Sequence, residues 1–146
     1  MRLTLVLLAV AGASLVAAGY ASAHAACTPG SIPGGRRFCG PAKATLNYGG
    51  KKYVFNQGGT CTVSGSTWSL NIGTITLTGS KPKYAYFGIT VFSRRPGTHS
   101  AAVSWQLHGK NLSLSNAKVT VSRGLKKGTF VGSVGGRKGS GSFRCR

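Results

Sequence analysis

The side chains that could do chemistry in this chain are almost all cationic. Lysine and arginine number 19, aspartate and glutamate are absent, and the formal net charge is +19 with histidine neutral. Unopposed cations at this density attract polyanions within a Debye length of about 8–10 Å at ordinary salt. Twelve of the cations form six close pairs, which are the candidate polyanion-binding residues: Arg36 and Arg37, Lys51 and Lys52, Lys81 and Lys83, Arg94 and Arg95, Lys126 and Lys127, and Arg137 and Lys138.

The charge has two interpretations. The cations could bind anionic polymers, lipid headgroups or nucleic acid, or they could only keep a glycine-rich β protein from associating edge to edge. Charges of either sign would serve solubility, so the complete lack of acidic side chains favours contact with polyanions. The chain is predicted to be exported and carries no nucleic-acid-binding motif, so nucleic acid is the least favoured of these partners.

The residue inventory excludes several classes of catalytic site. Without a carboxylate side chain there is no carboxylate acid/base pair, no Ser-His-Asp triad and no carboxylate cage for Ca²⁺ or Mg²⁺. A dyad of His99 or His108 with Ser100 or Ser104 would lack a carboxylate to orient the imidazole. We therefore expect no enzymatic activity, no metal and no cofactor.

Aromatic residues give two weaker binding hypotheses. Trp68 and Trp105 could stack on a carbohydrate, whereas Tyr84, Tyr86 and Phe87 could stack on nucleic-acid bases. Each of these residues also fits the alternating pattern of a β-strand. Burial in a β core is therefore the favoured interpretation for both sets.

Residues 1–25 are typical of a secretory signal peptide. Met1-Arg2 is a basic start, the run Leu3–Gly19 is apolar, and Ala21–Ala23 and Ala23–Ala25 are both possible cleavage sites. An uncleaved anchor is the alternative, although the run is barely long enough to span a bilayer. We expect a mature protein outside the cytoplasm, secreted or associated with the cell envelope, with no membrane span after cleavage.

Four cysteines, Cys27, Cys39, Cys61 and Cys145, give an even count. In a small exported chain this predicts two disulfides. Three pairings are possible; we favour Cys27–Cys39, which lies within one short segment, and Cys61–Cys145, which brackets the patterned region. The chain has no Cys-x-x-Cys, so zinc is disfavoured. Whether Cys27 is lipidated stays open, because His24 stands where a bulky aliphatic residue is usual.

These residues are positioned by a predicted β domain over residues 44–146, after a Pro/Gly-rich, disulfide-containing lead over residues 26–43 that is expected to be a loop. Gly49-Gly50 predicts a tight turn between strands at 44–48 and 51–55. Further strands are expected over 60–63, 67–72 (with 75–77 beyond a bend at Gly73), 84–92, 101–107, 112–114, 117–121, 128–134 and 139–145.

No sustained helical periodicity occurs after residue 44, so the fold class is all-β. We expect one antiparallel β-sandwich or partly open barrel of about eight or nine short strands, linked by disulfides. Nearly all of the six basic pairs fall in or beside predicted turns. The sandwich should therefore be cationic at its loop ends, and polar but uncharged along its faces.

Several short motifs resemble the LpqH-type lipoprotein antigen family of mycobacteria and other actinobacteria. They are Gly50–Val54 leading to Thr60-Cys61, Asn71–Gly73, Val103–Trp105 and Gly141–Cys145. The resemblance implies an envelope-associated, non-enzymatic protein with one β-rich domain and a bridge between Cys61 and Cys145.

The sequence thus favours a secreted, non-enzymatic cationic β-domain that associates electrostatically with anionic cell-envelope polymers or surfaces. The alternative is a structural or protein-interaction envelope protein whose charge serves only solubility. Steep salt dependence of binding would separate the first from the second. The sequence predicts neither the ligand nor the oligomeric state.

Overall fold

The computed structural model describes residues 27–79 and 81–146, so the predicted signal peptide lies outside the described residues. The described chain is all-β, as expected, with eleven strands and one short 3₁₀ helix, η1 (Arg123–Leu125). The strands are β1 (Gly30–Ile32), β2 (Gly35–Arg37), β3 (Lys43–Tyr48), β4 (Lys51–Phe55), β5 (Gly59–Ser64), β6 (Thr67–Thr76), β7 (Tyr86–Val91), β8 (Gly97–Leu107), β9 (Lys110–Val121), β10 (Lys127–Val134) and β11 (Arg137–Arg144).

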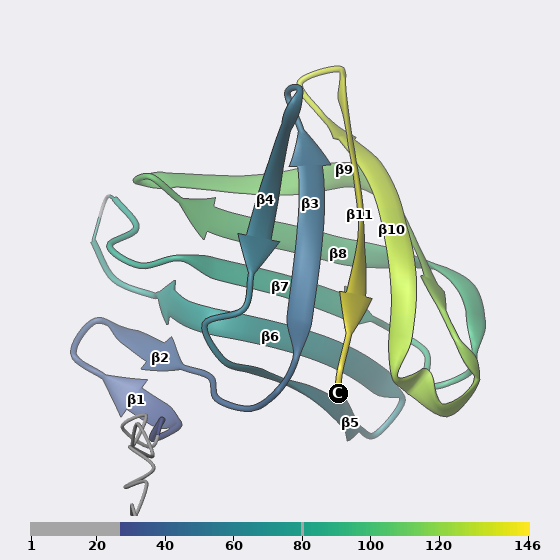
Figure 1. The fold of residues 1–146 in the computed structure, drawn as a ribbon, viewed down its shortest axis with the longest axis horizontal. Coiled ribbons are helices and arrows are strands. Elements are labelled where there is room, and N and C mark those ends of the chain that lie inside the picture. The colour runs from purple at the N-terminus through teal and green to yellow at the C-terminus, as the bar shows by residue number, and fades with distance from the viewer. Residues whose placement is uncertain (1–26, 80) are drawn as a thin grey trace, which may run out of the picture.

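The strands form one antiparallel sheet that folds over on itself. Its order is β1-β2-β6-β7-β8-β9-β10-β11-β3-β4, and β5 also pairs with β6. Figure 1 shows β3, β4, β10 and β11 running crosswise in front of β6, β7 and β8. We call β3, β4, β10, β11 and residues 117–121 of β9 the front layer. The back layer is β5, β6, β7 and residues 101–107 of β8.

The two layers enclose the apolar core. Alternation along β6 turns Trp68, Leu70 and Ile72 inward, and all three are buried. The tryptophans are 1% and 2% exposed, so the core interpretation is confirmed for Trp68 and Trp105, and the carbohydrate-stacking hypothesis is wrong. Ring contacts join the layers, with centroids 5.1 Å apart for Trp68 and Phe143.

Glycine makes room for these rings on the inner side of the front layer. A Cβ atom at Gly141 would lie 2.5 Å from Cζ of Phe130 and would also meet the backbone oxygen of Thr45. Gly128 is confined in the same way by Phe143, again at 2.5 Å. No larger residue fits at these positions unless the neighbouring strands move apart.

Three strands are clearly longer than the sequence predicted. β8 begins at Gly97, four residues before the expected strand at 101–107. The separate strands expected at 112–114 and 117–121 are one strand, β9, which continues through Asn116 at φ 51°. Asn adopts this left-handed conformation more readily than most residues, and a register shift next to it lets pairing resume. β6 likewise continues through Gly73 at φ 83°.

The prediction that the lead is a loop is wrong in part. Within residues 26–43, β1 and β2 form a small hairpin whose second strand pairs with the end of β6, with Gly35 opposite Thr76 and Arg37 opposite Thr74. Backbone hydrogen bonds with β6 stabilise this hairpin, and they do not require an alternating sequence. These two strands largely account for the excess over the expected eight or nine.

The favoured cysteine pairing is confirmed. The Cα atoms are 5.7 Å apart in Cys27–Cys39 and 5.6 Å apart in Cys61–Cys145. The second disulfide joins β5 of the back layer to the residue that follows β11 of the front layer. It therefore ties the two layers together across 84 residues of chain. In the described ranges, no helix has the length and apolar character that a membrane span needs.

Candidate anion-binding face

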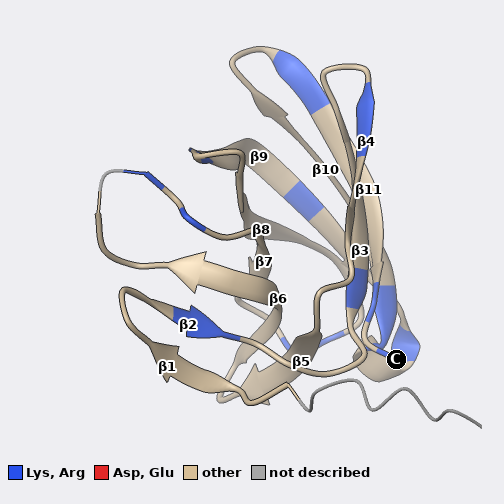
Figure 2. Cartoon of the chain, turned by 60° about the vertical axis from the view of Figure 1, so that its left-hand side comes forward, with Lys and Arg blue, Asp and Glu red and all other residues tan. Residues whose placement is uncertain are grey.

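Lysine and arginine are unequally distributed between the two layers. The strands β5, β6, β7 and β8 contain neither residue, whereas β3, β4, β10 and β11 all contain at least one. Figure 2 shows the basic segments of β3 gathered with others near the C-terminus. Apart from Arg36 and Arg37 of β2 and Lys110 at the start of β9, the cations of the described β strands therefore lie on the front layer.

Three cations of the front layer lie side by side on neighbouring strands. Lys127 of β10 is the register partner of Arg144 of β11, which is in turn the partner of Lys43 of β3. All three are exposed and point outward, because Ala44 and Phe143 beside them are buried. Directly opposite residues have Cβ atoms about 5 Å apart. We call Lys127, Arg144 and Lys43 the cationic row.

The cationic row destabilises the sheet on which it lies. Like charges directly opposite each other on neighbouring strands are destabilising. The sequence has no acidic side chain that could lie between them. A bound anion would relieve this repulsion, so the row has the electrostatics of an anion site and contributes nothing favourable to the fold by itself.

A row of hydroxyl groups lies next to the cationic row on the same face. It is formed by Thr120, Thr129, Ser142 and Thr45, which are successive register partners across β9, β10, β11 and β3. The Thr45 and Ser142 hydroxyl oxygens are 3.1 Å apart and hydrogen-bonded. We call these four residues the hydroxyl row.

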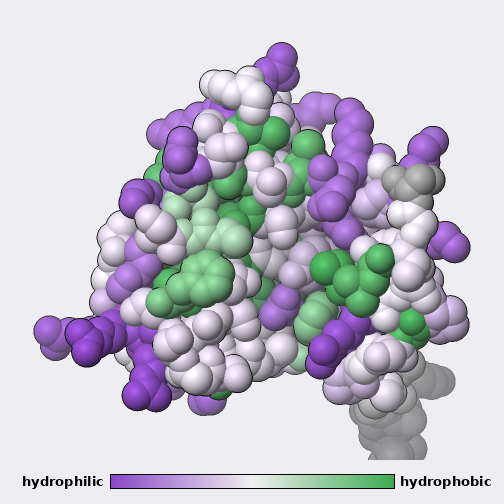
Figure 3. Space-filling view, turned by 180° about the vertical axis from the view of Figure 1, so that it is seen from behind, coloured by the Kyte–Doolittle hydropathy of each residue, from purple (hydrophilic) through white to green (hydrophobic). Residues whose placement is uncertain are grey.

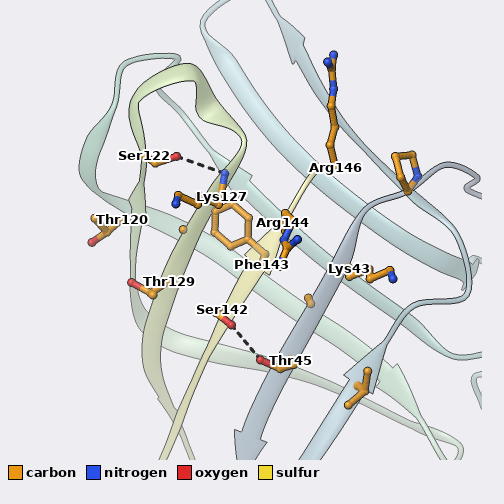
Figure 4. Close-up of a pocket in the computed structure, with 14 residues that line it drawn as sticks. Lys43, Thr45, Thr120, Ser122, Lys127, Thr129, Ser142, Phe143, Arg144 and Arg146 are labelled. Atoms are coloured by element: carbon orange, nitrogen blue, oxygen red, sulfur yellow. Dashed lines mark hydrogen bonds between the residues drawn. The ribbon is translucent and has the colours of Figure 1, made fainter.

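The two rows line an open groove with a volume of about 760 Å³. Arg146 adds a fourth cation to its lining, and Ser122 accepts a hydrogen bond from the backbone N–H of Lys127 at 3.3 Å. Figure 4 shows these side chains around the groove together with the Thr45–Ser142 hydrogen bond. Cations and hydroxyl donors thus converge on one surface that is open to a ligand.

A second group of cations lies at the opposite end of the front layer. The β3–β4 and β10–β11 turns are neighbours there, because Tyr48 is the register partner of Gly139. Two of the predicted basic pairs meet at these turns. We call this set the hairpin-end cations: Lys51, Lys52, Arg137 and Lys138.

The structure brings together only some of the predicted binding residues. Of the pair Lys126 and Lys127, the second belongs to the cationic row. The guanidinium of Arg36 lies 5.6 Å from the ring centroid of Phe38, beside Arg37 on β2. The remaining predicted residues lie in the loops that flank β7. Lys81 and Lys83 precede it, whereas Arg94 and Arg95 follow it and stand just before Gly97, which pairs with Val121 of the front layer.

The expectation of uncharged faces is confirmed for the back layer and wrong for the front layer. Lys43, Lys118 and Arg144 all point outward from front-layer strands. Sequence reasoning missed Lys43, Arg144 and Arg146 because it sought charges in pairs. Alternation alone places Lys43 and Arg144 on the outer side, but only the register of β3 with β11 shows that they are neighbours.

The outer side of the back layer is covered by uncharged side chains. Tyr86 folds across Gly88 and its hydroxyl donates to Oδ1 of Asn71 at 2.8 Å. Burial raises the pKa of Tyr86 to about 12. With Tyr86 and Phe87 buried, the proposed base-stacking platform is not formed, and only Tyr84 stays exposed. Figure 3 shows this rear side, where strongly hydrophilic side chains lie mostly toward the margins.

Two of the four candidate catalytic side chains, His99 and Ser100, are engaged in other contacts. Nε2 of His99 lies 2.9 Å from the carbonyl oxygen of Arg95, and Ser100 accepts a hydrogen bond from Nζ of Lys118 at 2.8 Å. His108 lies in the β8–β9 turn. Among the residues that the structure describes, no three potential metal-ligating side chains gather, and no buried side-chain nitrogen or oxygen lacks a partner. Nothing in the described interior therefore points to a ligand.

The resemblance to LpqH-type antigens rests on the short motifs alone and stays a prediction. No family model, no curated protein and no solved structure matches this chain.

Proposed function

We propose that this protein is an exported, non-enzymatic domain that binds anionic polymers of the cell envelope through the outer side of its front layer. The observation that carries the proposal is the cationic row, in which three like charges are register neighbours and the sequence offers no acidic side chain to separate them. A multivalent anion would neutralise them together, and the groove beside the row is open to a chain-like ligand.

The uneven distribution of charge favours binding over the alternative of solubility alone. Charges that only prevent association need not be adjacent, and adjacency weakens the sheet. Here, β5 to β8 carry no lysine or arginine, while three strands of the front layer place cations side by side. Two disulfides support an oxidising, extracytoplasmic location.

The experiment is a binding titration of the exported, disulfide-bonded protein against immobilised anionic polymer over a salt series. If two or three cations displace counterions, affinity should fall about 10- to 40-fold between 50 and 200 mM salt. Binding that does not change with salt, or no binding at 50 mM, would overturn the proposal. A polycation on the same matrix serves as the control and should not retain the protein.

A further inference from the structure

We infer that the polymer is one in which phosphodiester groups alternate with hydroxyl-bearing units, such as a polyol or sugar phosphate, and that it lies along the strands of the front layer. This inference rests on the proposed function and deepens it. The inference follows from the arrangement of that face, on which hydroxyl groups lie between two groups of cations.

On β3, β4, β10 and β11 the cations occupy the two ends of the front layer. Lys118 of β9 lies level with the middle of the face, at its margin, where its Nζ donates a hydrogen bond to Ser100 of β8. Arg144 and Lys138 lie at opposite ends of β11, six residues apart, which corresponds to about 20 Å along a strand. Between them, Ser142 and Ser140 point outward. On β3, Thr45 and Asn47 likewise separate Lys43 from the hairpin-end cations.

The middle of this face suits the uncharged part of a polymer. Hydroxyl and amide side chains donate and accept hydrogen bonds, as the hydroxyl groups of a polyol or sugar require. A polymer such as polyphosphate, with an anion at every backbone unit, would place more of its charges over the hydroxyl row, away from the cations, than a polymer whose successive anions are separated by a polyol or sugar. Those anions would keep their counterions, and their share of the binding free energy would be lost.

Nucleic acid fits the same face poorly. Single strands bind protein largely by stacking their bases on aromatic side chains. In the described front layer the aromatic residues alternate onto the inner side, including Phe55, Phe130 and Phe143, which are buried. The large apolar side chains that point outward are Val54 and Val131, and neither has a ring to stack on a base.

The test removes hydroxyl groups without changing charge. We would combine Thr45→Val, Thr129→Val and Ser142→Ala and measure binding to poly(glycerol phosphate) and to inorganic polyphosphate with the same number of phosphates. We expect affinity for poly(glycerol phosphate) to fall about tenfold, as the loss of a few hydrogen bonds implies. Affinity for polyphosphate should change by less than about twofold, since its contacts are with cations.

The matched control lies on the back layer, where Thr62 and Ser69 form a second cross-strand hydroxyl pair 2.8 Å apart. Combining Thr62→Val and Ser69→Ala with Thr90→Val should leave both affinities unchanged. Equal losses for the two polymers, or no loss for either, in the folded front-layer variant would overturn this inference and leave polyanion binding standing. If the wild-type protein binds neither polymer at low salt, the proposed function itself fails.

Discussion

The front and back layers share one core but present different surfaces to solvent. The back layer presents serine, threonine and asparagine, with Tyr86 folded flat over Gly88. The front layer has a similar background of hydroxyl groups, into which the cationic row is set. Since the back layer forms its strands without any lysine or arginine, charge on the strands is not a requirement of this fold. The cations of the front layer therefore call for an explanation outside stability.

The largest expected effect tests whether the two layers unfold as one unit. Replacing Cys61 and Cys145 by alanine should lower the free energy of unfolding by about 4–5 kcal/mol, because their bridge closes a long loop between the layers. Replacing Cys27 and Cys39, 12 residues apart, should cost about 3 kcal/mol. Denaturant unfolding measures both. A larger loss from the local bridge would show that the layers are not held together as described.

The next largest effect on the free energy of unfolding is expected when substitutions on the inner and outer sides of one front-layer strand are compared. Gly141→Ala should lower the free energy of unfolding by about 3 kcal/mol, because its methyl group meets Phe130 and the backbone of Thr45. Ser140→Ala, the outward neighbour, should change it by no more than about 0.5 kcal/mol. Denaturant unfolding again gives the answer. If the two substitutions cost the same, β11 does not pack against the core as the structure has it.

A third prediction concerns the back layer at alkaline pH. Tyr86 has a folded-state pKa of about 12 against an ordinary value of 10.0, so its stabilising contribution is complete below pH 10 and is lost as pH rises toward 12. Between pH 8 and pH 11.5 the loss should be about 2 kcal/mol. Lysine deprotonation occurs in the same range, and the Tyr86→Phe variant corrects for it. Unfolding curves at pH 8 and pH 11.5 should show a steeper decline for the wild type; parallel declines would contradict the burial of this hydroxyl.

The smallest expected effect is a gain in stability rather than a loss. Arg144→Thr removes the central charge of the cationic row and should raise the free energy of unfolding by about 0.5 kcal/mol at low salt, with less gain at high salt. Lys118→Thr is the control, because the register partners of Lys118 are the uncharged Ser100 and Val131. The Lys118→Thr substitution should not raise the free energy of unfolding. Thermal melts at two salt concentrations measure the difference, and a destabilised Arg144→Thr variant would show that the row supports the fold.

The sequence predicted the local parts of this fold well. Alternation located most strands, Gly49-Gly50 located the first hairpin of the β domain, and the favoured cysteine pairing is the observed one. It did not predict β1 and β2, because their pairing with β6 depends on backbone hydrogen bonds in a Pro/Gly-rich segment. Nor did it predict that β9 continues through Asn116, since a bulge has no periodic signature.

The candidate site was predicted less completely than the fold. Of the cationic row, only Lys127 was identified, because it has a basic neighbour in the sequence. Lys43 and Arg144 are isolated cations far apart along the chain, and they become neighbours only through the pairing of β3 with β11. Pairing between distant strands depends on how the whole sheet closes, which local patterns do not specify.

The most direct measurement compares two variants with the same net charge. The first combines Lys43→Gln, Lys127→Gln and Arg144→Gln on the front layer, and the second combines Lys81→Gln and Lys83→Gln in the loop before β7 with Arg36→Gln on β2. Each cation near an anionic surface contributes about 1 kcal/mol, so the first variant should bind poly(glycerol phosphate) about 100-fold more weakly than the wild type. The second should lose less than about threefold at the same salt. Equal losses would show that binding follows net charge alone and would contradict the front-layer site.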